Sequence, residues 1–182
     1  MRDLFDARLN VSDMPMDAAA LKEAVKSAEI LVPTVTDRVG TDIIEAAGPD
    51  LKLIANFGVG FNHIDVKAAR ARGIAVTNTP DVLTDPTADI TMTLLLAVTR
   101  RAVEGSDVLR SGKFAGWNPT WMMGVGLRGR ALGIVGMGRI GETVAQRSRA
   151  FGMKIHYHNR RRVSAEVVPE LEATYWPALD RM

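Results

Sequence analysis

The chain has 182 residues, 47% of them hydrophobic and 24% charged, and its 23 basic and 21 acidic residues give a formal net charge of +2. This composition is typical of an ordinary globular protein with one large domain or two small ones, and it gives no reason to expect nucleic acid or an anionic membrane as a partner. The sequence has no cysteine, which excludes disulfides, a thiolate nucleophile and Cys-ligated metals and fits a cytoplasmic protein.

The first part of the chain alternates short apolar runs with amphipathic stretches, a pattern that predicts β-α-β units and a parallel sheet. The N-terminal residues are charged and do not resemble a signal peptide. No apolar stretch is long enough to cross a membrane. We expect helices over residues 17–28, 41–47 and 65–72, and strands over residues 29–33, 51–56 and 74–76.

A change of pattern near residues 78–85 predicts a boundary between two α/β domains. Asp85 as the N-cap and Pro86 at the first helical position predict a helix that runs to about Ser111. Its stretch 90–98 is apolar nearly all round, which predicts a buried helix between domains or subunits. After an irregular segment, the sequence predicts a strand over 131–135, a helix ending near Phe151 and a strand over 153–158.

A glycine motif joins the strand at 131–135 to the following helix and predicts a dinucleotide-binding turn of the Rossmann type. The first glycine permits the tight turn, the second lets the backbone approach a pyrophosphate, and the third lets helix and strand pack closely. The alternative is that these glycines only tighten a strand-helix turn that binds no ligand. The motif is Gly136-Met137-Gly138-Arg139-Ile140-Gly141.

The end of the next predicted strand indicates which nicotinamide cofactor is preferred. Sites selective for NAD usually carry a carboxylate roughly 20 residues after the first glycine. Here that place is taken by Asn159, followed by Arg160 and Arg161. Since guanidinium groups bind a 2′-phosphate that a carboxylate would repel, we expect NADP(H) rather than NAD(H). The alternative is a solvated basic run on a surface turn.

Four stretches of the chain, in the right order, resemble the D-isomer-specific 2-hydroxyacid dehydrogenases, and the branch they resemble most is that of the glyoxylate and hydroxypyruvate reductases. The stretches are 56–65, 72–80, 82–101 and 132–141. The resemblance implies a flavodoxin-like substrate domain at residues 1–80, without its first strand. It also implies that residues 81–182 form the N-terminal part of a Rossmann coenzyme domain. Both domains are expected to be incomplete, as in a fragment shortened at both ends.

The resemblance also implies functional residues outside the glycine motif. The backbone N–H groups near Val59 and Gly60 are expected to hold the substrate carboxylate, and Trp117 is expected to reach the neighbouring subunit's active site in a homodimer. The alternatives are that the 58–60 loop only makes a turn that needs positive φ, and that the tryptophan only packs in the core. No metal site is expected.

The family reduces a keto acid by hydride transfer, with a histidine as general acid, a carboxylate that tunes it and an arginine that binds substrate. The resemblance places all three beyond the second Rossmann strand, so no catalytic residue is expected here. From the sequence, none of His63, His156 and His158 is a credible general acid.

The predicted function is therefore part of an NAD(P)H-dependent oxidoreductase acting on CH–OH groups, with glyoxylate or hydroxypyruvate as the 2-keto acid. One alternative is a catalytically silent dinucleotide-binding or corepressor-like protein. Another is a sister branch that oxidises phosphoglycerate or formate. Asn159-Arg160-Arg161 argues against that branch, which usually has an acidic residue there.

Overall fold

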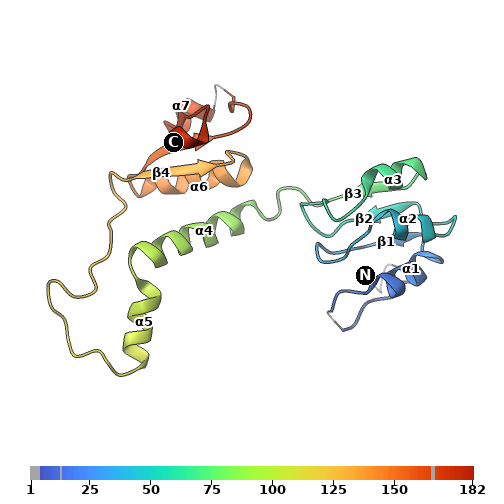
Figure 1. The fold of residues 1–182 in the computed structure, drawn as a ribbon, viewed down its shortest axis with the longest axis horizontal. Coiled ribbons are helices and arrows are strands. Elements are labelled where there is room, and N and C mark those ends of the chain that lie inside the picture. The colour runs from blue at the N-terminus through green and yellow to red at the C-terminus, as the bar shows by residue number, and fades with distance from the viewer. Residues whose placement is uncertain (1–4, 13, 165–166) are drawn as a thin grey trace. The chain divides into compact units, whose positions relative to one another are not determined.

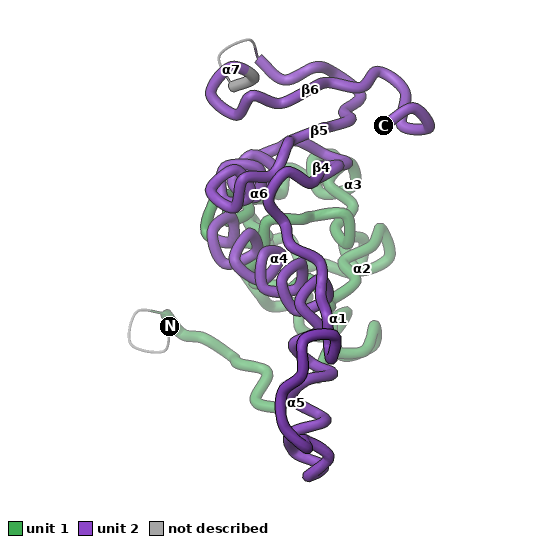
Figure 2. Tube along the Cα trace, turned by 90° about the vertical axis from the view of Figure 1, so that its left-hand side faces the viewer, with its two compact units in different colours: residues 1–82 green, residues 83–182 purple. Residues whose placement is uncertain are grey.

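The computed structural model describes residues 5–12, 14–164 and 167–182, and it confirms the predicted α/β class. The chain divides into two compact units, Met1–Val82 and Leu83–Met182 (Figure 1 and Figure 2). Each unit contains one three-stranded sheet, and every strand pair in both sheets is parallel. In the described part of the chain, no helix has the length and apolar character needed to cross a membrane.

The first unit is a small parallel sheet with one helix before each strand, and its strand order follows the chain order. The core is formed by apolar side chains of the sheet and helices, including Val25, Ile43 and Ile54, which are almost completely buried. Its elements are α1 (Ala18–Val25), β1 (Ile30–Leu31), α2 (Thr41–Ala46), β2 (Leu53–Ala55), α3 (Val66–Ala71) and β3 (Ala75–Thr77).

Aspartate side chains cap the N-termini of two helices of the first unit. Asp17 accepts a hydrogen bond from the N–H of Ala20 at 2.7 Å, which caps α1. Asp65 caps α3 by accepting from the N–H of Ala68 at 2.9 Å, and its other oxygen accepts from the hydroxyl of Thr41 at 2.6 Å. The hydrogen bond from Thr41 is the main cause of a lowered pKa at Asp65. This carboxylate therefore links the start of α2 to the start of α3.

The second unit has its sheet in the order β4-β5-β6, with α6 connecting β4 to β5. Leu132 and Ile134 of β4 and Tyr157 of β5 contribute to the core, and α4 packs on α6 through Met92 and Val144 (Figure 1). Its elements are α4 (Thr84–Thr99), α5 (Ala102–Arg110), β4 (Ala131–Val135), α6 (Arg139–Ala150), β5 (Lys154–His158), α7 (Val167–Leu171), β6 (Thr174–Tyr175) and a 3₁₀ helix, η1 (Leu179–Arg181).

The single helix predicted from residue 85 to about 111 is wrong, because the chain breaks it into α4 and α5. Arg101 adopts a left-handed backbone, with φ 55° and ψ 36°. A non-glycine residue in this conformation cannot continue an α-helix. The Arg101 guanidinium pairs with Glu104 one turn later, at 2.5 and 2.8 Å, which stabilises the bend.

The apolar stretch of α4 is only partly covered within this chain, and its burial against another domain or subunit stays a prediction. Ala88 and Met92 are buried against α6. By contrast, Ile90, Leu94 and Val98 are 54%, 59% and 77% exposed. They recur every four residues and thus share one face of α4. A second apolar face is therefore left uncovered by the described residues.

Candidate functional site

The glycine turn between β4 and α6 has a different physical requirement at each of its three glycines. Gly136 has φ +102°, which side chains rarely tolerate. A Cβ at Gly141 would lie only 2.3 Å from the carbonyl oxygen of Gly136, so the helix passes too close to the turn for any side chain. At Gly138 no atom of the described residues would lie within 4 Å of an added Cβ. The backbone at Gly138 is thus open to close approach by a ligand.

The N-terminus of α6 lies directly behind this turn. Its N-cap residue is Gly138, which has no side chain to cap the helix. The first N–H groups of an α-helix have no intrahelical acceptor, and the helix dipole gives this end a partial positive charge. Such an end of a twelve-residue helix is chemically suited to phosphate oxygens.

A cavity of about 900 Å³ lies where the turn meets the carboxyl end of β5. Ligands of open parallel sheets bind at the carboxyl ends of the strands, and both β4 and β5 end here. None of the described lining residues is a carboxylate, while two are arginines. The lining consists of Val135, Gly136, Met137, Gly138, His158, Asn159, Arg160, Arg161 and Leu179.

Asn159 holds the glycine turn from the end of β5. Its Oδ1 accepts from the N–H of Met137 at 2.6 Å, and its Nδ2 donates to the carbonyl oxygen of Met137 at 3.2 Å. Both ends of this side-chain amide are therefore bound to one residue of the turn. Arg160 and Arg161, by contrast, are exposed at the edge of the cavity. Of these three side chains, the two arginines place positive charge at the cavity, whereas the Asn159 amide is bound to the turn.

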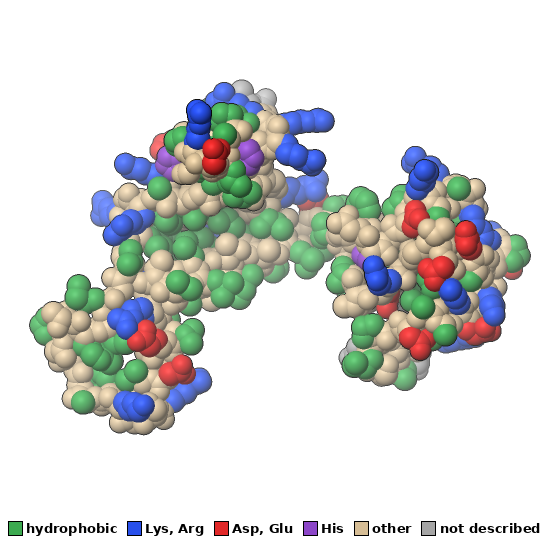
Figure 3. All heavy atoms as spheres, in the orientation of Figure 1, with side chains coloured by type: hydrophobic (Ala, Val, Ile, Leu, Met, Phe, Trp, Pro, Cys, Tyr) green, Lys and Arg blue, Asp and Glu red, His purple; other side chains and the backbone are tan. Residues whose placement is uncertain are grey.

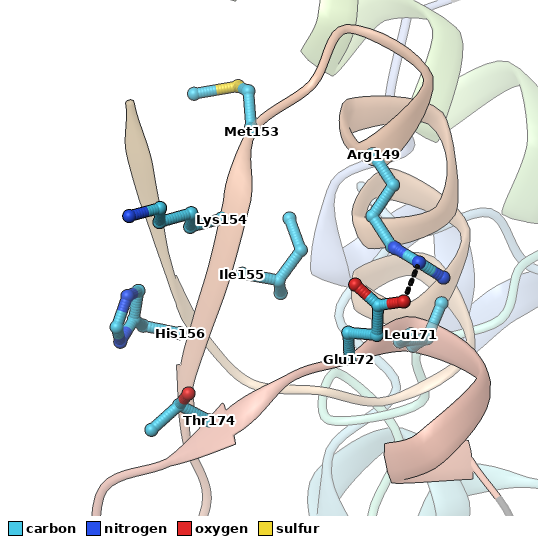
Figure 4. Close-up of a pocket in the computed structure, with 8 residues that line it drawn as sticks. All are labelled: Arg149, Met153, Lys154, Ile155, His156, Leu171, Glu172 and Thr174. Atoms are coloured by element: carbon cyan, nitrogen blue, oxygen red, sulfur yellow. Dashed lines mark ion pairs between the residues drawn. The ribbon is translucent and has the colours of Figure 1, made fainter. Parts of the chain in front are cut away.

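A second hollow of about 250 Å³ lies at the opposite, starting end of β5 (Figure 4). There Arg149 and Glu172 form an ion pair at 2.8 Å on one side of β5, and Lys154 and His156 point to the other side. This hollow is far from the glycine turn along the strand and has an arginine already neutralised by a carboxylate. It therefore contributes to packing rather than to the dinucleotide cavity.

The predicted carboxylate loop follows β2 in the first unit. Neither Gly58 nor Gly60 has a positive φ, so the alternative that this loop needs glycine for that reason is wrong. A Cβ at Gly58 would lie 2.7 Å from Cγ1 of Val35, which makes glycine necessary for close approach. At Gly60 an added Cβ would meet no described atom within 4 Å. Val59, between them, is 36% exposed.

Trp117 lies in the irregular loop after α5, and its side chain is 78% exposed. The alternative that it packs in the core is therefore wrong for this chain. Trp121, in the same loop, packs on Phe114 with ring centroids 5.5 Å apart. The loop thus presents aromatic surface outward.

Each of the three histidines has a structural hydrogen-bond partner. Nε2 of His63 is 2.9 Å from Oδ1 of Asn56, an amide rather than a carboxylate. Nδ1 of His156 accepts from the indole N–H of Trp176 at 2.9 Å, and Nδ1 of His158 is 2.9 Å from the carbonyl oxygen of the same tryptophan. None of them has the acidic partner that would orient a general acid.

Two residues that hold the site were not singled out in the sequence, Asn56 and Asn78. Asn56 is 2% exposed and is one of the two buried polar side chains of the described residues. The signal in the sequence that could have identified Asn56 is a polar side chain directly after an apolar strand. The hydrogen-bond partners of Asn56 are Gly58, Gly60 and His63, which lie two, four and seven residues later in the chain. No spacing rule predicts these partners.

The comparisons with known proteins find similar proteins of one family of dehydrogenases. A family model for the catalytic domain of D-isomer specific 2-hydroxyacid dehydrogenases matches residues 1–173. Glyoxylate reductase of Thermococcus litoralis is 49% identical over 159 residues, 85% of this chain and 47% of that protein. Glyoxylate reductase of Thermococcus kodakarensis is 41% identical over 179 residues, 96% and 53% of the two chains.

The solved structures include a close match in fold from Polaromonas sp. JS6 66, which is described as a D-isomer specific 2-hydroxyacid dehydrogenase, NAD-binding. It superposes with a TM-score of 0.90 at 44% identity, and the match covers 99% of this chain and 56% of that one. The chain spans about half the length of the curated relatives it matches.

Proposed function

Because the chain belongs to the D-isomer-specific 2-hydroxyacid dehydrogenase family, we propose that it forms the substrate-loop and phosphate-binding part of a 2-keto acid reductase. Residues 1–80 are the substrate domain, and residues 81–182 are the N-terminal part of the coenzyme domain. The observation that carries the proposal is the cavity at the carboxyl ends of β4 and β5, which is lined by the glycine turn up to Gly138, the N-cap residue of α6. The glyoxylate reductases among the relatives support glyoxylate as the substrate, and hydroxypyruvate is the second candidate of this proposal.

In this proposal the chain's own residues bind and orient. The bound nicotinamide dinucleotide supplies the hydride. Residues 136–141 hold its pyrophosphate through backbone N–H groups at the start of α6, where the dipole favours negative charge. Val59 and Gly60 hold the carboxylate of the keto acid through backbone N–H groups. Since each histidine is bound in a structural role, the chain by itself binds its ligands without turnover.

The cofactor in this proposal is NADP(H) rather than NAD(H). Arg160 and Arg161 are exposed at the cavity, and no described carboxylate lines it to repel a 2′-phosphate. Asn159 adds no charge and keeps the turn in place through Met137. Guanidinium groups bind phosphate oxygens through charge-assisted hydrogen bonds, which are about twice as strong as neutral ones.

The working assembly in this proposal is a homodimer to which Trp117 contributes. Hydrophobic side chains gather on the surface over α4 and the loop after α5 (Figure 3). Leu94 and Val98 of α4, Val103 of α5 and Trp117 are each more than half exposed. Exposed large apolar side chains gathered in one region favour an interaction site there. Light scattering should give a dimer for the wild type and a monomer for Leu94→Asp, and a monomeric wild type would contradict the assignment.

Two measurements test the binding function. NADPH at one hundred times its Kd should stabilise the chain by about 2.7 kcal/mol in a thermal-shift assay, because it binds only the folded state. No shift with NADPH, NADH or ADP-ribose would reject a dinucleotide site. A version extended to the length of the relatives should oxidise NADPH with glyoxylate. Binding without turnover by that version would favour the silent dinucleotide-binding alternative instead.

A further inference from the structure

Three successive carbonyl groups of the loop after β2 are held by asparagine side chains. Asn56 Nδ2 donates to the carbonyl oxygens of both Gly58 and Gly60, at 2.9 Å each. Asn78 Nδ2 donates to the carbonyl oxygen of Val59, which lies between them, at 2.8 Å. The backbone N–H of Thr79 adds a second bond to Gly58 at 3.1 Å. Every carbonyl of the 58–60 loop is therefore fixed.

Fixing these carbonyls also fixes the direction of the N–H groups that follow them. The peptide unit is planar and trans, with no cis bond among the residues that the structure describes, so the N–H of each unit points opposite to its C=O. The N–H groups of Val59 and Phe61 therefore point away from Asn56, and the N–H of Gly60 points away from Asn78. In the part of the chain that the structure describes, no acceptor is found for any of the three. All three are therefore donors available to a ligand.

The Asn56 amide is oriented without ambiguity. Both hydrogens of Nδ2 are taken by the two carbonyls, so Oδ1 faces His63 and accepts from its Nε2–H at 2.9 Å. The side chain is 2% exposed. A buried amide with all its donors satisfied is rigid, whereas its loss would leave the carbonyl of Gly60 without a partner.

We propose that Asn56, assisted by Asn78, is a positioning residue that preorganises the amides of Val59, Gly60 and Phe61 for the carboxylate of the keto acid. The inference rests on the proposed function, because it takes this loop as the carboxylate site. Preorganised donors bind an anion without an entropic penalty for ordering the loop. The two asparagines act through the loop backbone and do not touch the substrate.

The test is a titration of the chain with oxamate, a non-reducible 2-keto acid analogue, followed by backbone amide NMR. In the wild type, the amides of residues 59–61 should shift and saturate. Asn56→Ala should raise the oxamate Kd by about tenfold or more, while the amide chemical shifts outside the loop remain those of a folded protein. Asn78→Ala should raise it by a smaller factor. Asn62→Ala is the matched control, because this exposed asparagine of the same loop binds none of the three carbonyls.

The possible results separate the inference from the function beneath it. If the wild type binds oxamate and Asn56→Ala binds it with an unchanged Kd, the positioning role is overturned and the carboxylate site stands. Binding by Asn56→Ala that weakens only in proportion to its unfolded fraction would also overturn the positioning role. No binding by the wild type overturns the carboxylate site and the inference together. Should Asn56→Ala not fold, Asn78→Ala decides, and an unchanged Kd there counts against the inference.

Discussion

Replacing Gly141 by alanine is expected to destabilise the unit of residues 83–182 by about 2 kcal/mol. The added Cβ would lie 2.3 Å from the carbonyl oxygen of Gly136 and 3.3 Å from Cγ2 of Ile134. Because the nearest atom belongs to the backbone, α6 must move away from β4. Overpacking of this kind costs about 1–3 kcal/mol, and the greater helix propensity of alanine offsets at most about 1 kcal/mol. The backbone obstacle favours the upper end of the range.

Tryptophan emission is a suitable assay, because all three tryptophans, Trp117, Trp121 and Trp176, lie within residues 83–182. A loss of about 2 kcal/mol should lower the Tm of this unit by about 8–16 °C. A Gly141→Ala variant that melts within about 3 °C of the wild type would refute the packing argument.

Gly138→Ala is the matched control for the same turn. Its Cβ meets no described atom within 4 Å and its φ is −100°, so its Tm should stay near that of the wild type. It should nevertheless lose the stabilisation by NADPH, because the methyl group occupies the space left for the pyrophosphate. Full NADPH stabilisation of Gly138→Ala would refute the assignment of this turn as the phosphate site.

Three further outcomes are expected. Arg160→Ala should weaken NADPH binding about tenfold and change NADH binding little. Arg162→Ala, which removes a guanidinium that lies over the ring of Tyr175, should change neither affinity. An equal preference for the two cofactors before and after Arg160→Ala would contradict the NADP assignment. Thr41→Val should move the pKa of Asp65 back toward its ordinary 3.8 in an NMR titration. A lowered pKa supplies stability that is present above pH 3.8 and is lost as pH falls through the folded-state pKa. Because the variant lacks this contribution, it should be less stable than the wild type above pH 3.8, and the difference should shrink as pH falls below that value. Arg72→Met should destabilise the first unit by about 1 kcal/mol in urea unfolding followed by circular dichroism, because its guanidinium donates to carbonyls at the C-terminal end of α2, and an unchanged midpoint argues against that cap.

Much of the fold was predictable from local pattern. The strand at 131–135 has the predicted bounds, and α6 ends at Ala150, one residue before its predicted end. Glycines at fixed spacing after an apolar strand have few other uses, so this part of the pattern specifies its own structure. The short strand β6 and helix α7 were not predicted, since each has too few residues for a periodic signal.

The helix break was beyond sequence reasoning for a different reason. Arg101 has ordinary helix propensity and follows an apolar run, so every local rule favours continuing the helix. The left-handed conformation is adopted where the chain after α5 returns, with the N–H of Val125 donating to the carbonyl of Thr99 at 2.7 Å and Arg101 pairing with Glu104. Non-local contacts thus override the propensity of a single residue.

The glycine motif, its strand and helix, the basic turn after β5 and the family resemblance were all contained in the sequence, because they depend on residue type at fixed spacing. The tertiary structure alone decided which side chains hold the glycine turn at 136–141 and the loop at 58–60. Asn159 meets Met137 only because parallel pairing of β4 and β5 brings the ends of both strands together. Asn78 meets Val59 only because β3 lies beside β2. A hydrogen bond between residues about twenty positions apart depends on strand register, and register is set by the packing of the whole sheet.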